Sequence, residues 1–225
     1  MASPFYLICG VLSVNPVLFI LISIIFDTNK HSIKLFIFKM SYCTTIQSMP
    51  EGDKKILHKR YHDFHYGFPI NDDDELFGRL LMEINQAGLS WETILKKEES
   101  FRKAYSQFDL EVVANYTEKD RERLLNDAGI IRNKLKVNAA IENAKTILGL
   151  QGEFGSFGAW LAHHHPKTKE NWTLLFKKTF KFTGGEIVNE FLMSIGYLEG
   201  AHDEHCEIMK TIIPLQPKWL KADIK

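Results

Sequence analysis

The chain has 225 residues, of which 45% are hydrophobic and 25% are charged, an ordinary globular composition that excludes disordered and fibrous classes. Its 28 basic residues balance its 28 acidic residues, so any nucleic-acid site must be a local patch rather than an effect of overall charge. The cysteines are too few and too scattered for a disulfide framework, which points to a reducing compartment or to metal ligation: Cys9, Cys43 and Cys206.

The first 39 residues differ from the rest of the chain. A run without charged residues extends from Phe5 to Phe26 and is about as long as a bilayer-spanning helix. Asn15 and Pro16 interrupt it, and it has neither the basic start nor the cleavage site of a signal peptide. Two interpretations remain open: an upstream extension before a natural start at Met40, which we favour, or a membrane anchor.

The domain boundary and the cellular location follow from this segment. We expect residues 1–39 to be an apolar extension and residues 40–225 to form the functional domain. Basic residues after the apolar run would hold that flank, and with it the rest of the chain, in the cytoplasm: Lys30, Lys34 and Lys39.

Helical periodicity dominates from residue 72 onward. Apolar residues at three- and four-residue steps predict a helix between Asp72, a candidate N-cap, and Gly88, a helix breaker. Ser90 is expected to cap a second helix that runs from Trp91 to Phe108.

The later part of the chain continues this pattern. Thr117 and Asp120 predict a capping box, and Gly129 suits the left-handed position after the helix that follows. Asn133 precedes an apolar stripe that stops near Gly149. Further helices are expected at Phe157–His164, Asn171–Phe180 and Glu186–Ile195, with residues 166–170 as a loop between two lobes. Almost no segment alternates with period two, so we predict an all-α, two-lobed helical bundle.

Two groups of residues could form a binding pocket. Tyr61, His62 and Tyr66 belong to a dense set of aromatic rings and imidazoles near a helix boundary, and taken alone the set is better explained as core aromatics with solubilising histidines. Glu83 lies on an otherwise apolar helical face that leads to Trp91. A buried carboxylate is costly unless it is paired, so this position indicates either a functional site or a side chain that reaches solvent.

A metal site is the third possibility. His202 and Cys206 are four residues apart and would share a face if helical, and Cys43 and His62 could complete a tetrahedral Cys2His2 set. His205 is a rival ligand to His202, and a free cysteine beside a surface histidine is the simpler alternative.

Basic residues near glycine turns are the fourth feature. Glycine turns that lead into helix N-termini present free N–H groups to phosphate, and neighbouring cations add attraction, so DNA-backbone contacts are expected here. An ordinary solvated charged face is the alternative for each cluster. The residues are Arg132, Lys134 and Lys136 after Gly129, and Lys177, Lys178 and Lys181 before Gly184.

Four motifs in order resemble the bacterial DNA-3-methyladenine glycosylase I family. They are Tyr61-His-Asp63, Gln86-Ala-Gly-Leu-Ser-Trp91, Asp127-Ala-Gly-Ile-Ile-Arg-Asn133 and Phe180-Lys-Phe-Thr-Gly184. The resemblance spans about Tyr61 to Cys206 and implies a helix-hairpin-helix glycosylase fold, in which a flipped base enters a pocket between two lobes. It implies excision of 3-methyladenine from alkylated double-stranded DNA by a monomer with no obligate protein partner.

The resemblance also assigns residues. Glu83 corresponds to the carboxylate that reads the base, Trp91 and Tyr61 to its stacking walls, and His62, His202 and Cys206 to three ligands of a structural Zn²⁺, with Cys43 as the fourth. We expect a hydrolase without lyase activity, with Tyr66 as a third base-binding ring and backbone contacts from Arg132, Lys134, Lys181 and Gly184.

Two departures from the family pattern leave an alternative. The family commonly has Glu-Trp-Gly where this chain has His65-Tyr66-Gly67, and a tryptophan where this chain has Thr45. The alternative is therefore a catalytically inactive, zinc-containing module that binds DNA or senses damage. The intact segment from Glu83 to Trp91 argues against it.

Overall fold

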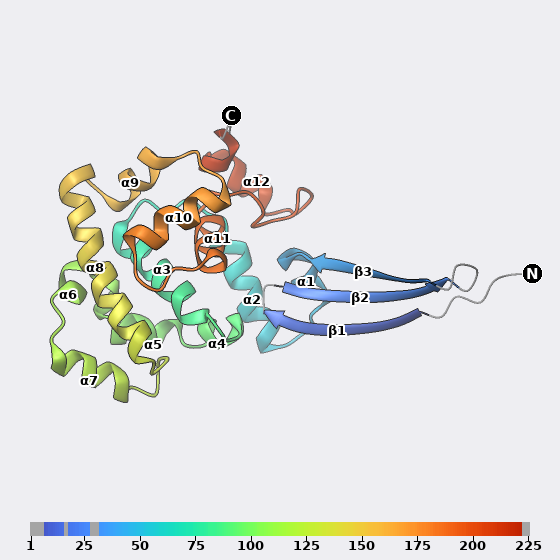
Figure 1. The fold of residues 1–225 in the computed structure, drawn as a ribbon, viewed down its shortest axis with the longest axis horizontal. Helices are drawn as coiled ribbons and strands as arrows, with labels where there is room; N and C mark the ends of the chain where they lie inside the picture. The colour runs from blue at the N-terminus through green and yellow to red at the C-terminus, as the bar shows by residue number, and fades with distance from the viewer. Residues whose placement is uncertain (1–6, 16–17, 28–31, 222–225) are drawn as a thin grey trace, which may run out of the picture.

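The computed structural model describes residues 7–15, 18–27 and 32–221. A helical body follows a three-stranded sheet at the N-terminus (Figure 1). The α-helices are α1 Tyr42–Ser48, α2 Asp53–Phe64, α3 Asp73–Gln86, α4 Trp91–Leu95, α5 Glu98–Ala104, α6 Leu110–Ala114, α7 Glu118–Asn126, α8 Lys134–Phe154, α9 Phe157–His164, α10 Lys169–Thr179, α11 Gly185–Ser194 and α12 Met209–Ile212. Short 3-10 turns occur at η1 Ser106–Phe108, η2 Ile213–Leu215 and η3 Lys218–Lys221.

The apolar N-terminal run forms strands. β1 (Leu7–Asn15) pairs antiparallel with β2 (Leu18–Asp27), which pairs antiparallel with β3 (Ser32–Met40). The periodicity did not predict these strands, but long runs of isoleucine, valine and phenylalanine have high strand propensity. The predicted helical architecture is confirmed for residues 41–221. Within the described part of the chain, no helix is both long and apolar enough to cross a membrane.

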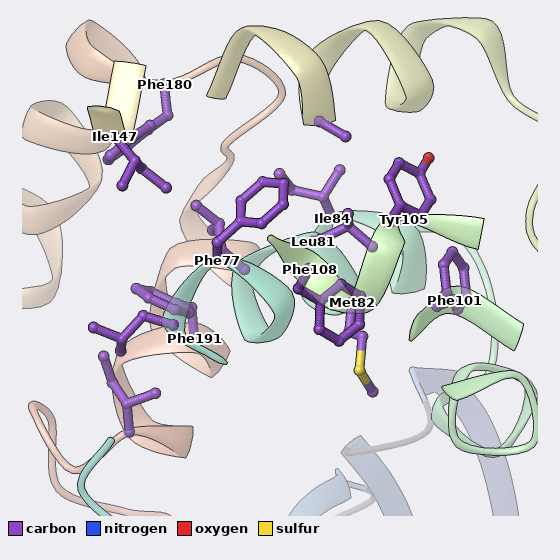
Figure 2. Packing of buried hydrophobic residues seen from close by; sticks show 14 of the residues in the cluster. Phe77, Leu81, Met82, Ile84, Phe101, Tyr105, Phe108, Ile147, Phe180 and Phe191 are labelled. Atoms are coloured by element: carbon purple, nitrogen blue, oxygen red, sulfur yellow. The ribbon is translucent and has the colours of Figure 1, made fainter. Parts of the chain in front are cut away.

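Helix α3 lies at the centre of the body. Asp72 accepts a hydrogen bond from the Glu75 N–H at 2.9 Å, which confirms the predicted N-cap. The helix packs against α4, α8, α9, α11 and η1, and its apolar face is almost fully buried. Figure 2 shows Phe77 and Leu81 of this helix among rings from the other elements, including Phe108 and Phe191. The core therefore surrounds the face of α3 that carries Glu83.

The helix predicted from Trp91 to Phe108 is broken. Ser90 does cap it, with the Thr93 N–H 3.1 Å from its hydroxyl oxygen, but α4 ends at Leu95 and α5 at Ala104. Phe108 then has φ of 67° and packs its ring onto Gly78 of α3, where an added Cβ would lie 2.2 Å from the ring. The helical path ends where residues 106–108 adopt left-handed φ and Phe108 makes this buried contact.

Two glycine predictions were wrong. Gly129 is not among the residues with left-handed φ; its N–H donates to Asp127 Oδ1 at 2.7 Å, and a side chain would crowd that carboxylate and Ser100. Gly149 does not end α8, which continues to Phe154 before Gly155, with φ of 90°. Tertiary contacts, rather than helix termination, explain the glycine at position 129.

Candidate functional site

A group of aromatic and acidic side chains gathers where α2, α3, α4 and α11 meet. We call it the carboxylate–aromatic cluster and define it as Tyr61, Tyr66, Glu83, Trp91 and Glu190. The rings of Tyr61 and Trp91 meet edge to face with centroids 5.0 Å apart, and the rings of Tyr61 and Tyr66 are 5.6 Å apart. The four predicted site residues Tyr61, Tyr66, Glu83 and Trp91 are all buried.

Local structure explains how these rings converge. Tyr61 lies in the last turn of α2, and the backbone then turns so that the N–H groups of His65 and Tyr66 both bond to the Tyr61 carbonyl. Gly67 follows with φ of 83°, and its N–H donates to the Ser194 carbonyl at the end of α11. This turn places Tyr66 beside α11. The segment is thus the end of a helix and the turn after it.

Glu83 is held in a poorly solvated position. It lies on the buried face of α3 and is 4% exposed. Burial raises the pKa of its carboxyl well above the usual value, the neighbouring Glu190 carboxylate raises it further, and the Arg79 guanidinium lowers it. The alternative that Glu83 reaches solvent is therefore wrong. The ionised carboxylate is poorly compensated here and would favour a cation beside it.

Two charged side chains at this cluster, Glu190 and Arg79, were not predicted from the sequence. Glu190 of α11 accepts a hydrogen bond from the Tyr66 hydroxyl, with Oε2 3.1 Å from that oxygen. Arg79, one turn before Glu83, donates from Nη1 to the Tyr61 hydroxyl and to the His65 carbonyl, both at 3.2 Å. Its guanidinium also lies 5.2 Å from the Tyr61 ring centroid. A carboxylate on an apolar helix, the signal that identified Glu83, also occurs at Glu190 beside Val188 and Phe191.

The carboxylate–aromatic cluster also contains a buried hydrogen-bond donor that lacks a partner among the described residues. The indole Nε1–H of Trp91 is buried and has no hydrogen-bond partner among the described residues. A buried donor without a partner costs free energy, and most buried polar groups in proteins have a partner.

Two cysteines and two histidines form a second cluster, which we call the Cys2His2 cluster: Cys43, His62, His202 and Cys206. Their ligand atoms all lie within 4.8 Å of one another. His62 Nε2 is 3.1 Å from His202 Nδ1 and 3.2 Å from Cys43 Sγ, and Cys206 Sγ is 3.7 Å from each ring nitrogen. A tetrahedral Zn²⁺ would separate such atoms by about 3.3–3.8 Å, so the donor set fits. The cluster could hold a metal ion.

The other ring nitrogens are already engaged. His62 Nδ1 lies 2.7 Å from Asp63 Oδ1, and His202 Nε2 lies 2.7 Å from the Tyr66 carbonyl oxygen. These partners fix the tautomers that leave one nitrogen of each ring free for a metal. Burial lowers the pKa of His202 to about 4, so its ring is neutral as a ligand requires.

The Cys2His2 cluster joins the two ends of the body. Cys43 lies in α1, His62 in α2, and the other two ligands in the segment before α12. The segment from His202 to Cys206 is a turn, in which the Cys206 N–H donates to the Asp203 carbonyl, rather than the helix we considered. His205 is exposed and outside the cluster, so the rival ligand is excluded by position.

The helical hairpin formed by α7 and α8 carries the first basic group. Asn133 caps α8, with its Oδ1 2.9 Å from the Leu135 N and 3.2 Å from the Lys136 N. Arg132 and Lys134 flank this cap and are exposed, as phosphate contacts require. Lys136 is buried, and its ammonium group donates to the carbonyls at the end of α3. The expectation that Lys136 meets a phosphate is therefore wrong.

The loop between α10 and α11 carries the second basic group. Lys181 is bound to α8 through its backbone: its N–H donates to Asn143 Oδ1 at 2.7 Å, and its carbonyl accepts from Asn143 Nδ2 at 3.1 Å. The side chains of Lys181 and Phe182 are exposed, and Gly184 is the N-cap of α11. An added Cβ at Gly184 would meet nothing within 4 Å. The loop is thus held rigidly while its tip and the α11 N-terminus stay open.

Comparisons with known proteins agree on one family. The sequence model of the methyladenine glycosylase family matches residues 52–174. DNA-3-methyladenine glycosylase 1 of Escherichia coli (strain K12) is 38% identical over 159 residues, which are 62% of this chain and 85% of that protein. DNA-3-methyladenine glycosylase of Haemophilus influenzae is 35% identical over 158 residues, again 62% of this chain and 85% of that protein.

Solved structures give the same result. A 3-methyladenine DNA glycosylase I from Staphylococcus aureus has a TM-score of 0.61 at 32% identity and covers 68% of this chain and 90% of its own. A tyrosine-to-phenylalanine variant of a 3-methyladenine DNA glycosylase I, solved in complex with 3-methyladenine, has a TM-score of 0.65 at 29% identity. That likeness covers 75% of this chain and 97% of the other.

Proposed function

The chain belongs to the methyladenine glycosylase family, and on that premise we propose that it is a DNA-repair N-glycosylase that hydrolyses the glycosidic bond of 3-methyladenine in alkylated DNA. The abasic product would enter base excision repair. One observation carries the proposal: the buried Glu83 carboxylate acts on Tyr61 and Tyr66, and the Trp91 ring packs edge to face on Tyr61. This arrangement selects for a flat cation.

The chemistry of the substrate suits such a site. A purine methylated at N3 is positively charged in DNA and departs as a neutral base, so it needs little help from an acid. Aromatic faces attract the cation by about 0.5–2 kcal/mol for each well-placed ring, and the Glu83 carboxylate can accept the exocyclic N–H. The unpartnered Trp91 Nε1–H is a donor for an acceptor atom of the base. Charge and shape together would separate the alkylated base from normal bases.

The base must leave the DNA stack, which costs a few kcal/mol. We propose that the α7–α8 hairpin is the family's helix-hairpin-helix element, with Arg132 and Lys134 on phosphates, and that Lys181 and Gly184 hold the backbone at the α11 N-terminus. The exposure of these groups and the rigid attachment of the loop to Asn143 support this assignment. Backbone contacts of this kind would offset the cost of flipping.

Lysine chemistry is not needed for this reaction. The buried Lys136 donates to two carbonyls and lies 5.7 Å from the Phe182 ring centroid, so its amine is engaged in holding the fold. We propose a monofunctional hydrolase in which Glu83 acts by electrostatic stabilisation. Strand cleavage at the lesion with a reducible imine would contradict this part of the proposal.

The Cys2His2 cluster is proposed as a structural zinc site. Four protein ligands close a tetrahedral sphere and leave no position for an activated water, so the ion would join α1, α2 and the C-terminal turn rather than take part in hydrolysis. The cluster connects to the base site through one bond, because His202 Nε2 bonds to the carbonyl of Tyr66. Zinc would thereby help hold the Tyr66 ring in place.

The full-length protein should be tested on methylated duplex DNA by following each free alkylpurine chromatographically. We expect release of 3-methyladenine, a loss of about 100-fold in Glu83→Gln, and no loss in Glu111→Gln, an exposed control. No release by a folded, metal-loaded protein would contradict the proposal and favour the inactive DNA-binding module.

A further inference from the structure

Glu190 is an acidic residue that has no role in the reaction proposed above. It is half-buried on α11, which packs directly against α3. Its Oε2 accepts the Tyr66 hydroxyl at 3.1 Å, and its charge acts on Glu83, Tyr61 and Tyr66 together. It therefore lies at the carboxylate–aromatic cluster, facing the residues assigned to the base.

Charged groups of both signs act on the rings of the carboxylate–aromatic cluster. Two carboxylates, Glu83 and Glu190, and one guanidinium, Arg79, face the buried rings of Tyr61 and Tyr66. Like charges at close range destabilise each other, and a cation placed between them removes that repulsion. Arg79 is committed to the Tyr61 hydroxyl and the His65 carbonyl. A cationic ligand beside Glu83 would therefore also feel the charge of the Glu190 carboxylate.

The contact with Tyr66 adds a second effect. A tyrosine whose hydroxyl donates to a carboxylate keeps a fixed ring orientation, since one buried bond sets the end of the side chain. The His202 ring bonds to the carbonyl of the same residue, so Tyr66 is held at both its backbone and its hydroxyl. Its face is then presented to a ligand without further ordering, which reduces the entropy cost of binding.

We propose that Glu190 is a specificity-determining residue of the base site: as a second carboxylate beside Glu83, it stabilises the flipped cationic purine and fixes Tyr66 as a stacking wall. The inference rests on the proposed function. The positive charge is present on the bound base and disappears as the base departs. Glu190 therefore strengthens binding of the flipped base more than it lowers the barrier to bond cleavage.

The test is a single-turnover assay of 3-methyladenine release from methylated duplex DNA, with the full-length protein and Glu190→Gln. Glutamine keeps an acceptor for the Tyr66 hydroxyl and removes only the charge. We expect the half-saturating protein concentration to rise about 10-fold, which equals about 1.4 kcal/mol, while the maximal rate changes by less than about threefold. Glu111→Gln, the exposed control on α6, should behave as the parent.

A second variant keeps the test decisive if Glu190→Gln fails to fold. Tyr66→Phe removes the hydrogen bond that glutamine at position 190 would keep, and it should raise half-saturation about 3-fold. In the double variant both losses should be seen together, because one change removes the charge and the other removes the hydrogen bond. Parent-like half-saturation in both single variants would overturn the inference alone. A fall in maximal rate with unchanged half-saturation would also overturn it and indicate a structural role.

Absence of the proposed glycosylase activity would give a different result. If neither the parent nor Glu111→Gln releases 3-methyladenine while both are folded and metal-loaded, the proposed function is contradicted, and the inference about Glu190 is overturned with it.

Discussion

Lys136 and Ala87 are joined by a 2.7 Å hydrogen bond from the lysine Nζ to the alanine carbonyl, and the same ammonium group donates to the Asn85 carbonyl at 2.9 Å. These carbonyls lie at the C-terminal end of α3, where a helix lacks internal donors and carries partial negative charge. Lys136 is only 4% exposed. A cation from α8 thus caps the helix that carries Glu83.

Lys136→Met should destabilise the protein. The substitution keeps most of the side-chain volume but leaves two carbonyls without their charged donor, at a cost of about 2–4 kcal/mol. Urea unfolding followed by far-UV circular dichroism measures this loss. Lys134→Met, two residues away and exposed, is the control and should change the free energy of unfolding by less than about 0.5 kcal/mol. Equal stabilities of the two variants would contradict the capping role.

Gly78→Ala should destabilise the core for a steric reason. The new Cβ would lie 2.2 Å from the Phe108 ring, and overpacking of this kind costs about 1–3 kcal/mol. Gly149→Ala provides the matched change, because it lies within α8 with nothing inside 4 Å of its Cβ, and should stabilise by about 0.5–1 kcal/mol. Thermal unfolding of both variants would show opposite shifts. Shifts of the same sign would contradict this account.

Local signals in the sequence predicted local structure well. Asp72, Ser90 and Asn133 each cap a helix because their short polar side chains reach N–H groups only two or three residues away. Phe157–His164 is a helix with the predicted bounds. Such bonds depend on neighbouring residues alone, so a single sequence contains the necessary information.

Features set by tertiary contacts were not predictable in the same way. Gly129 was predicted to end a helix, but a side chain there would crowd Ser100 of α5. Lys136 was predicted to contact phosphate, but it is buried against α3. Glu190 meets Tyr66 across a separation of 124 residues. The Cys2His2 ligands were predicted from residue type and resemblance, although the helical spacing assumed for His202 and Cys206 is a turn.

Metal removal should weaken the fold. Without a cation, burial raises the pKa of the Cys43 thiol to about 12, so the free thiolate is strongly disfavoured. Binding energy of a structural zinc is folding energy, and a chelator should lower the melting temperature by about 10 °C or more. Cys206→Ser should lose the bound zinc in elemental analysis, whereas His205→Ala, exposed and one residue away, should keep it. Retention of one zinc per chain by Cys206→Ser would contradict the assigned ligand set.

Base excision should depend on pH through Glu83. Its folded-state pKa is raised by burial and by Glu190, so the proton leaves only at pH values above the usual glutamate range. The ionised form attracts the cationic base, and excision should therefore rise with pH through this raised pKa and then level off. In Glu83→Gln this acidic limb should disappear along with most of the activity. An acidic limb that persists in the variant would assign it to another group.

The raised pKa of Glu83 also predicts how stable Glu83→Gln is. A carboxyl whose folded pKa is raised costs stability once the pH exceeds its unfolded pKa, and the cost grows until the pH reaches the folded value. Glu83→Gln should therefore be at least as stable as the parent at neutral pH, and this gain should vanish near pH 4. Urea unfolding at both pH values would detect it. Lower stability of the variant at neutral pH would show that Glu83 holds the fold rather than serving the site.

DNA affinity should depend on the exposed cations at the α7–α8 hairpin. Lys134 lies next to the Asn133 cap and is not engaged by any bond that the structure describes, so its charge is available to a phosphate. Lys134→Ala should weaken binding equally for alkylated and normal duplexes and should reduce the slope of log affinity against log salt by about 1. Lys103→Ala, an exposed control on α5, should leave the slope unchanged. A selective loss for alkylated DNA would instead place Lys134 in recognition of the base, since a phosphate contact carries no information about the lesion.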